Sequence, residues 1–338
     1  MRVTTMPPVA AATAGAVCIS SSAVLMKLAS TASPSVVALG RCAFALPVLG
    51  VLALRERRRG GTGTTPMPSR SRWLARLAGV FLAADLILWS HTIAAIGAGL
   101  GTVIGNLEVL IISLLAWLVL GERPSRSLVL ASPVMLAGLV LVGGLAEAGG
   151  SHAYGTDPAL GVGLGVGVAV LYAVYILMLR QATSPAGAGT AVAGADTAVA
   201  APLFEATVGG VAGSALLGLV LGDLRLGPPW PALGWLVLLA LTSQVIGWLL
   251  ITVSMPRLAA GTIGALLLIQ PAGSVALSYV ILGERPSLLQ LAGVALILTG
   301  VMVAVTGRAP EAAYSRRRTK IIRHASAAST GTSPSKSP

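Results

Sequence analysis

Several ionisable side chains lie inside long apolar stretches of the sequence, where a charge needs a specific partner. Arg41, Asp85 and Glu108 each fall within such a stretch. Charged groups in hydrocarbon cost a few kcal/mol each, so they usually face a partner or a cavity. One cation and two acids could bind a zwitterionic solute through charge-assisted hydrogen bonds. We therefore predict that these residues line a central cavity; the alternative is an Arg41–acid pair that only neutralises itself.

Other polar and aromatic residues of the apolar stretches could complete this cavity. Trp89 follows Asp85 by one helical turn and would form an apolar wall. Glu205 lies in a stretch whose edges are poorly defined, and His91 is interpreted as an interfacial residue rather than a proton relay. Either cavity acid could exchange a proton with water, so proton coupling and uniport both stay open. The remaining candidates, neutral partners and a second wall, are Asn106, Gln244, Trp248 and Gln270.

The apolar content decides the fold class that must position these residues. Of the 338 residues, 55% are hydrophobic and 10% charged, and the mean hydropathy is +0.87. A soluble core of this length could not hide so much apolar surface. The apolar stretches are long enough to cross a bilayer as helices, and they lack the alternation of a membrane barrel. We predict an all-α membrane protein with ten transmembrane helices, at about 8–29, 35–54, 73–93, 99–120, 128–147, 158–179, 197–221, 231–254, 258–281 and 288–306.

Lysine and arginine are distributed unevenly between the predicted loops. The chain has 23 of them against 11 Asp and Glu, which gives a formal charge of +12. With both termini inside, most fall in cytoplasmic segments, above all in the loop of residues 55–72 and the tail of residues 308–338. This distribution fits the positive-inside rule and argues against nucleic acid as a partner. The basic segments could bind anionic lipid headgroups or merely set the topology.

The string LGERPS occurs at Leu120–Ser125 and again at Leu282–Ser287, an offset of 162 residues. At the same offset Ala98-Gly99 matches Ala260-Gly261. We infer two five-helix repeats, over residues 1–150 and 151–307. Because five is odd, the second repeat enters the membrane from the opposite side, an arrangement common in secondary transporters.

Each copy of the string is expected to form a tight turn between spans, outside the substrate site. Its glycine would take the left-handed cap that ends a helix. Its proline would open the first turn of the next helix, and its glutamate would lie near that helix's positive end. These residues are Gly121, Glu122 and Pro124 in the first copy, and Gly283, Glu284 and Pro286 in the second.

Several short motifs occur along residues 10–306: the two Gly-Glu-Arg copies, Gln270-Pro271, the run of Lys27, Ser33, Pro34, Gly40 and Arg41, and the glycines Gly138 and Gly300. Together they make the chain resemble the drug/metabolite transporter superfamily, specifically the EamA-type permeases. At Glu108-Val109 the chain departs from the family pattern, which favours a proline at Val109, so a proline kink is plausible at Pro271 and in doubt in the fourth span.

The resemblance implies ten helices, two cytoplasmic termini and a central cavity shared by both halves. It also implies export or exchange of small metabolites, commonly amino acids or related compounds. We therefore expect a secondary transporter that works by alternating access. The alternatives are a drug or multidrug efflux permease and a membrane scaffold that transports nothing.

Other classes of protein find little support in the sequence. There is no nucleophile elbow and no His-Glu-x-x-His, and the three histidines are scattered. We therefore expect no enzyme, no metal site and no cofactor. No ring of charges indicates a channel. The first apolar stretch is longer than the core of a signal peptide, so we expect it to be retained. We place the protein in the cytoplasmic membrane, as a monomer or homodimer.

Overall fold

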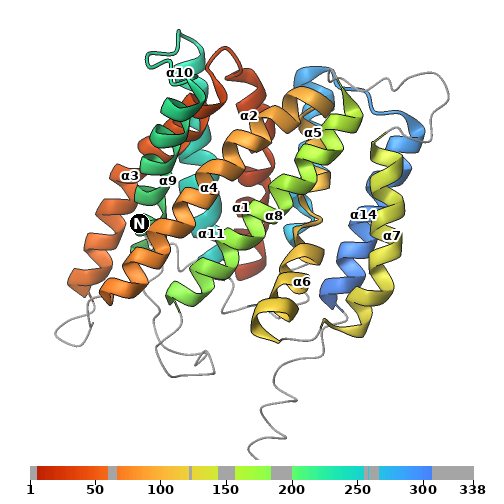
Figure 1. Cartoon of the computed structure of the whole chain (residues 1–338), viewed down its shortest axis with the longest axis horizontal. Coiled ribbons are helices and arrows are strands. Elements are labelled where there is room, and N and C mark those ends of the chain that lie inside the picture. Colours follow the sequence, from red (N-terminus) through yellow and green to blue (C-terminus); the bar gives the residue numbers. More distant parts are fainter. Residues whose placement is uncertain are drawn as a thin grey trace, which may run out of the picture.

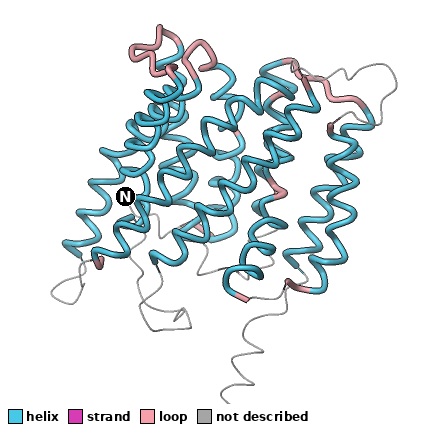
Figure 2. Tube along the Cα trace, in the orientation of Figure 1, coloured by secondary structure: helices cyan, strands magenta, loops and turns pink. Residues whose placement is uncertain are grey.

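The chain is described by a computed structural model that covers residues 6–59, 67–121, 124–143, 157–183, 200–254, 258 and 266–306. These residues form helices and the turns between them (Figure 2). In the first half the helices are α1 (Pro8–Ser20), α2 (Ser22–Leu28), α3 (Pro34–Arg59), α4 (Ser69–Ile96), α5 (Ala98–Gly105), α6 (Glu108–Leu120) and α7 (Arg126–Val142). In the second half they are α8 (Pro158–Thr183), α9 (Ala200–Leu221), α10 (Ala232–Leu239), the π-helix η3 (Ala240–Gly247), α11 (Trp248–Ser254), α13 (Ile269–Leu277), the π-helix η5 (Ser278–Leu282) and α14 (Leu288–Thr306).

Eight helical segments of the described chain are long and apolar enough to cross a membrane. Two further apolar helices, Arg126–Val142 and Ile269–Leu282, are shorter than a full span. They occupy the fifth and ninth predicted spans, and the neighbouring residues 144–156 and 259–265 lie outside the described part of the chain. The chain is therefore an all-helical, multi-pass membrane protein with eight candidate spans, and the predicted count of ten is met only if both shorter helices also cross.

The fourth and ninth predicted spans are both interrupted, and at equivalent positions. In the first repeat Asn106 and Leu107 form a turn between α5 and α6. In the second, a turn at Leu268 precedes α13, and Leu268 is the repeat-mate of Asn106 at the offset of 162 residues. Pro271 lies in the first turn of α13, where backbone N–H groups have no acceptor within the helix, so the missing N–H of proline costs no helical hydrogen bond. The second repeat therefore breaks close to Pro271, where a kink was plausible, and the first repeat breaks at the equivalent position without a proline.

Helix α4 lies at the centre of the bundle, packed against both α8 and α9, while α7 and α14 pair at one side (Figure 1). Close approach of α4 and α9 depends on glycine. A Cβ at Gly79 of α4 would overlap the carbonyl of Ala206 in α9, and one at Gly209 would overlap the carbonyl of Arg76. Lipid supplies no hydrophobic force that would hold helices together, so their association depends on close packing, which small residues permit. The close packing fixes the helix on which Asp85 and Trp89 lie.

The two copies of LGERPS form helix-ending turns, partly as predicted. Gly121 and Gly283 both take the left-handed conformation, with φ of 70° and 71°, which confirms the predicted caps. The next helix begins after the serine rather than at the proline. Ser125 accepts a hydrogen bond from the Leu128 N–H (3.3 Å). Ser287 and Gln290 exchange reciprocal side-chain to backbone bonds of 2.9 and 3.1 Å, a capping box.

Glu284 does not serve the helix that follows it, contrary to our expectation. Its carboxylate accepts hydrogen bonds from the backbone N–H groups of Ala98 (2.8 Å) and Gly99 (3.1 Å), at the N-terminus of α5 in the other repeat. Only 4% of Glu284 is exposed, so this cap is buried. Gly97, the residue before α5, has φ of +99°, and a Cβ at this position would crowd the Glu284 carboxylate. Glu122, the repeat-mate of Glu284, lies outside the described residues.

Removing this cap should destabilise the contact between the two repeats. In Glu284→Ala two N–H groups of α5 lose their acceptor, which should cost about 1–3 kcal/mol and lower the unfolding temperature in detergent. Glu284→Gln should recover part of the loss, because its amide oxygen can still accept. The exposed neighbour Arg285 provides the control, and Arg285→Ala should leave the transition unchanged. Equal stability of Glu284→Ala and Arg285→Ala would contradict the assignment.

Candidate functional site: a charged cavity between the repeats

A cavity of about 130 Å³ lies inside the bundle and is lined by residues of both repeats. Its walls come from α1 to α6 in the first repeat and from α8, η3, α11 and α13 in the second. The lining residues are Ile19, Ser22, Ala23, Arg41, Leu82, Asp85, Leu86, Trp89, Thr102, Gly105, Asn106, Glu108, Val168, Tyr172, Tyr175, Gln244, Trp248 and Gln270. An interior space with three charged side chains is a candidate binding site.

Eight of the nine residues singled out from the sequence line this cavity. They are Arg41, Asp85, Trp89, Asn106, Glu108, Gln244, Trp248 and Gln270. They come from distant parts of the chain, and the fold brings them together. Their role in binding a substrate remains a prediction.

Glu205, the ninth candidate, lies elsewhere. Its carboxylate accepts a 2.7 Å bond from Arg76 Nε and links α9 to α4. It does not line the cavity. The apolar stretch that contains Glu205 becomes α9 from Ala200 on, which places Glu205 in the second turn of that helix. Its role is therefore an ion pair between helices.

The two helix breaks deliver repeat-mates to the cavity. Glu108 is the first residue of α6, directly after the turn at Asn106 and Leu107. Gln270, its mate at the offset of 162 residues, is the second residue of α13. An acid in the first turn of a helix is favoured by the helix dipole, so the break stabilises the charge that it places in the cavity. Asn106 donates from Nδ2 to the Thr102 carbonyl (2.8 Å), which ties its side chain to α5.

Arg41 is held by neutral groups rather than by an acid. Its Nε donates to Gln244 Oε1 (3.1 Å) and its Nη1 donates to Ser22 Oγ (3.1 Å). Its guanidinium lies 6.0 Å from the ring centre of Trp89, within reach of a cation–π interaction. Gln244 lies in the π-helical segment η3 and is 2% exposed. Within the described part of the chain the structure shows an ion pair for Arg76 and Glu205 and none for Arg41, whose charge shares the cavity with Asp85 and Glu108.

The two acids of the cavity keep hydrogen-bonding capacity. Asp85 is 4% exposed, and its Oδ1 has no hydrogen-bond donor within the described structure. Asp85 and Trp89 lie one turn apart on α4, so they share a face of that helix. Glu108 is half-buried and lines the same space. A buried carboxylate oxygen without a donor carries the cost of its desolvation, which a ligand with an N–H group could offset.

Sequence reasoning missed the aromatic wall contributed by α8. Tyr172 and Tyr175 line the cavity, with ring centres 5.6 Å apart and ring planes tilted by 54°. Tyrosines in an apolar stretch resemble ordinary interior residues, and no ionisable neighbour in sequence marks them. The packing of α8 on α4 brings them to the same cavity as Asp85. With Trp89 and Trp248 they give the cavity four aromatic side chains among its uncharged lining residues.

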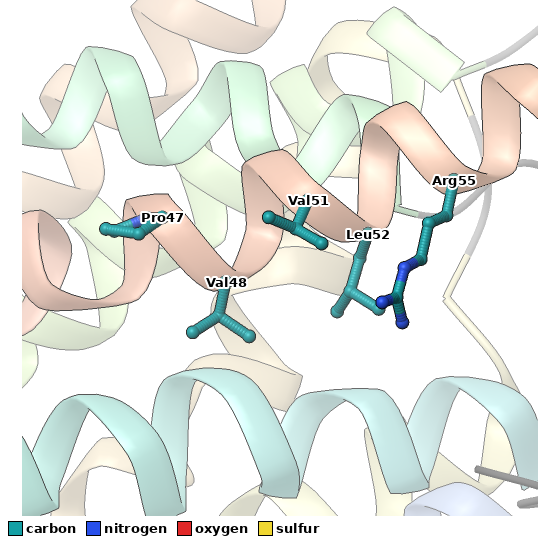
Figure 3. A pocket seen from close by; sticks show the side chains of 5 residues that line it. All are labelled: Pro47, Val48, Val51, Leu52 and Arg55. Atoms are coloured by element: carbon teal, nitrogen blue, oxygen red, sulfur yellow. The ribbon is translucent and has the colours of Figure 1, made fainter.

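A second, more open pocket of about 330 Å³ lies along α3. Figure 3 shows its lining side chains, Pro47, Val48, Val51, Leu52 and Arg55, all on one helix. Four of the five are apolar, and no polar group faces them from a second element of this lining. Recognition of a polar solute needs converging polar groups, so the cavity between the repeats is the better candidate. The described residues contain no cluster of three or more His, Cys, Asp or Glu that could hold a metal ion.

A helical bundle with many membrane-spanning helices and a charged cavity between two repeats defines a multi-pass membrane protein of the transporter type. Comparison with known protein families matches residues 6–144 and 159–306 to the EamA-like transporter family. The chain therefore belongs to the EamA-like transporter family, whose members are membrane transporters and generally not enzymes. The two matched ranges correspond to the two repeats.

Solved structures support the fold. One matching crystal structure is 20% identical in sequence, with a TM-score of 0.54 over 87% of this chain and 94% of that chain. At this identity the likeness shows the fold alone. No curated protein matches the chain.

The geometry at Arg41 gives a prediction for stability. Gln244→Leu should leave the buried Nε of Arg41 without its acceptor and reduce the free energy of unfolding by about 1–3 kcal/mol. Thr242→Val is the control, because its exposed hydroxyl bonds only within its own helix, to Leu238 O. Thermal unfolding of the purified variants in detergent compares them. Unfolding temperatures that match for the two variants would contradict the role given to Gln244.

Proposed function

We propose that the protein is a secondary transporter that exports or exchanges small metabolites, such as amino acids or related compounds, across the cytoplasmic membrane by alternating access. The observation that carries the proposal is the charged cavity lined by both repeats. A site shared by two halves can open to one side or the other when the halves rock against each other. Discontinuous helices whose first turns reach the site are typical of transporters that work in this way.

The proposed threading places both termini in the cytoplasm. The arginine-rich end of α3 and the start of α4 lie at the same end of the bundle (Figure 1). The positive-inside rule assigns that end to the cytoplasm. Counting α7 and the α13–η5 segment as crossings gives ten passes and puts the two repeats in opposite orientations. In this threading the Glu284 cap closes the bundle near its outer face.

Cavity size favours metabolites over drugs. Pockets for drug-sized ligands usually measure roughly 300–1,000 Å³, more than the 130 Å³ found here. This supports small solutes and leaves multidrug efflux as the weaker alternative. A scaffold would have no use for Arg41, Asp85 and Glu108 around a cavity, because each charge costs free energy in an apolar bundle. One chain holds both halves of the pathway, so a monomer could suffice and a homodimer would contain two pathways.

Exchange in proteoliposomes tests the proposal. Vesicles with purified protein and an internal mixture of amino acids should exchange labelled leucine faster than vesicles without protein. Glu108→Gln should slow this exchange roughly ten- to a hundred-fold, the effect expected from losing about 1.5–3 kcal/mol of charged hydrogen bonding. Glu205→Gln is the matched control outside the cavity and should exchange at the rate of the wild type.

Two results would count against this account. Unchanged exchange by Glu108→Gln across the pH range would remove Glu108 from the mechanism. Lack of exchange for amino acids, nucleobases and cationic drugs, with the protein present in the vesicles, would favour the scaffold. A separate measurement distinguishes proton coupling from uniport: exchange that depends on an imposed proton gradient indicates proton coupling.

A further inference from the structure

The charges around the cavity are not balanced. Two carboxylates, Asp85 and Glu108, and one guanidinium, Arg41, line it. The guanidinium is directed to Gln244 and Ser22, at 3.1 Å each, and lies over Trp89. Neutral partners leave the charge of Arg41 in place, so the charged side chains of the lining carry one excess negative charge when both acids are ionised.

Asp85 supplies the most specific observation. It is 96% buried, lines the cavity, and its Oδ1 has no donor in the described structure. Buried polar atoms without a partner are rare, so a carboxylate that lines a cavity and lacks a donor marks a residue to which a ligand could supply the missing bond. Because a carboxylate only accepts hydrogen bonds when ionised, the ligand must bring a donor.

The surroundings of Asp85 favour a cationic donor over a neutral one. Glu108 borders the same cavity, and Trp89, Tyr172, Tyr175 and Trp248 are among its lining residues. Aromatic faces attract cations, above all desolvated ones. An ammonium group has three donors and a compact positive charge, so it can satisfy both carboxylates while it lies against an aromatic ring.

We propose that the cavity recognises its substrate through a protonated amine held by Asp85 and Glu108, and that a substrate carboxylate is dispensable. The substrate class is small organic amines, including amino acids, which bind chiefly through their ammonium group. This inference rests on the proposed transport function, since it concerns the same cavity. It narrows the zwitterion expected from the sequence, because two acids outnumber Arg41 and two of the five N–H donors of Arg41 are already bonded to Gln244 and Ser22.

Matched trios of ligands test the inference on the wild-type protein. One trio is leucine, isopentylamine, which lacks its carboxylate, and isocaproate, which lacks its amino group; another is phenylalanine, phenethylamine and hydrocinnamate. Isothermal titration of the purified protein should give amines that bind within about tenfold of their amino acids. The deaminated acids should bind at least roughly thirtyfold more weakly, since about 1.4 kcal/mol corresponds to each factor of ten.

One substitution and its control give an independent test. Asp85→Asn should weaken amine binding roughly ten- to a hundred-fold. Asp157→Asn makes the same change on an exposed residue that caps α8 through the Leu160 N–H (3.0 Å), and asparagine caps a helix equally well. Its amine affinity should equal that of the wild type.

The outcomes separate this inference from the transport function. Acids that bind as tightly as amines, or an unchanged affinity in Asp85→Asn, would overturn the ammonium site even where vesicles exchange amino acids. Amine binding without any exchange would support the ammonium site and contradict transport. A protein that binds no member of either trio would refute the inference.

Discussion

The cost of carrying Arg41, Asp85 and Glu108 through an apolar bundle constrains the rest of the structure. None of the three can face lipid without a penalty of several kcal/mol, so each must lie in the interior and find a polar group. Arg41 finds Gln244 and Ser22, one from each repeat. Asp85 and Glu108 face the cavity. Helix α4, which carries Asp85, is packed between α8 and α9, so the side chain is shielded from lipid.

The two repeats complete each other's backbone as well as the cavity. The fourth and ninth predicted spans break at the same register. The N-terminus of α5, at the opposite end of that short helix from the break, is also buried and needs a partner for its N–H groups. Glu284 of the second repeat satisfies the N-terminus of α5 in the first. One turn further along α5, Thr102 and Ser274 share a hydrogen bond of 3.0 Å across the same interface. The second copy of LGERPS therefore forms a turn and also a contact between the repeats, because its Glu284 joins the end of η5 to the N-terminus of α5.

Local sequence patterns indicated which side chains are buried in the bundle. They did not indicate the position of a side chain whose interaction partner is distant in the sequence. A charge in an apolar stretch is a strong signal, and it located Asp85 correctly in the cavity. The same signal misled for Glu205, because Arg76 on another helix was within reach. Tyr172 carries no such signal and was missed. Helix rules placed Glu284 beside the next helix, whereas its partners lie 185 and 186 residues away.

The central claim is that two repeats of opposite orientation enclose one cavity. Arg126 and Leu288 occupy the same position after the two copies of LGERPS, and both are exposed. The most direct measurement is labelling of single cysteines at these positions with a thiol reagent that does not cross membranes, in a background without Cys18 and Cys42. Arg126→Cys should react only from the cytoplasmic side and Leu288→Cys only from the outside. Labelling of both from the same side would contradict the inverted arrangement.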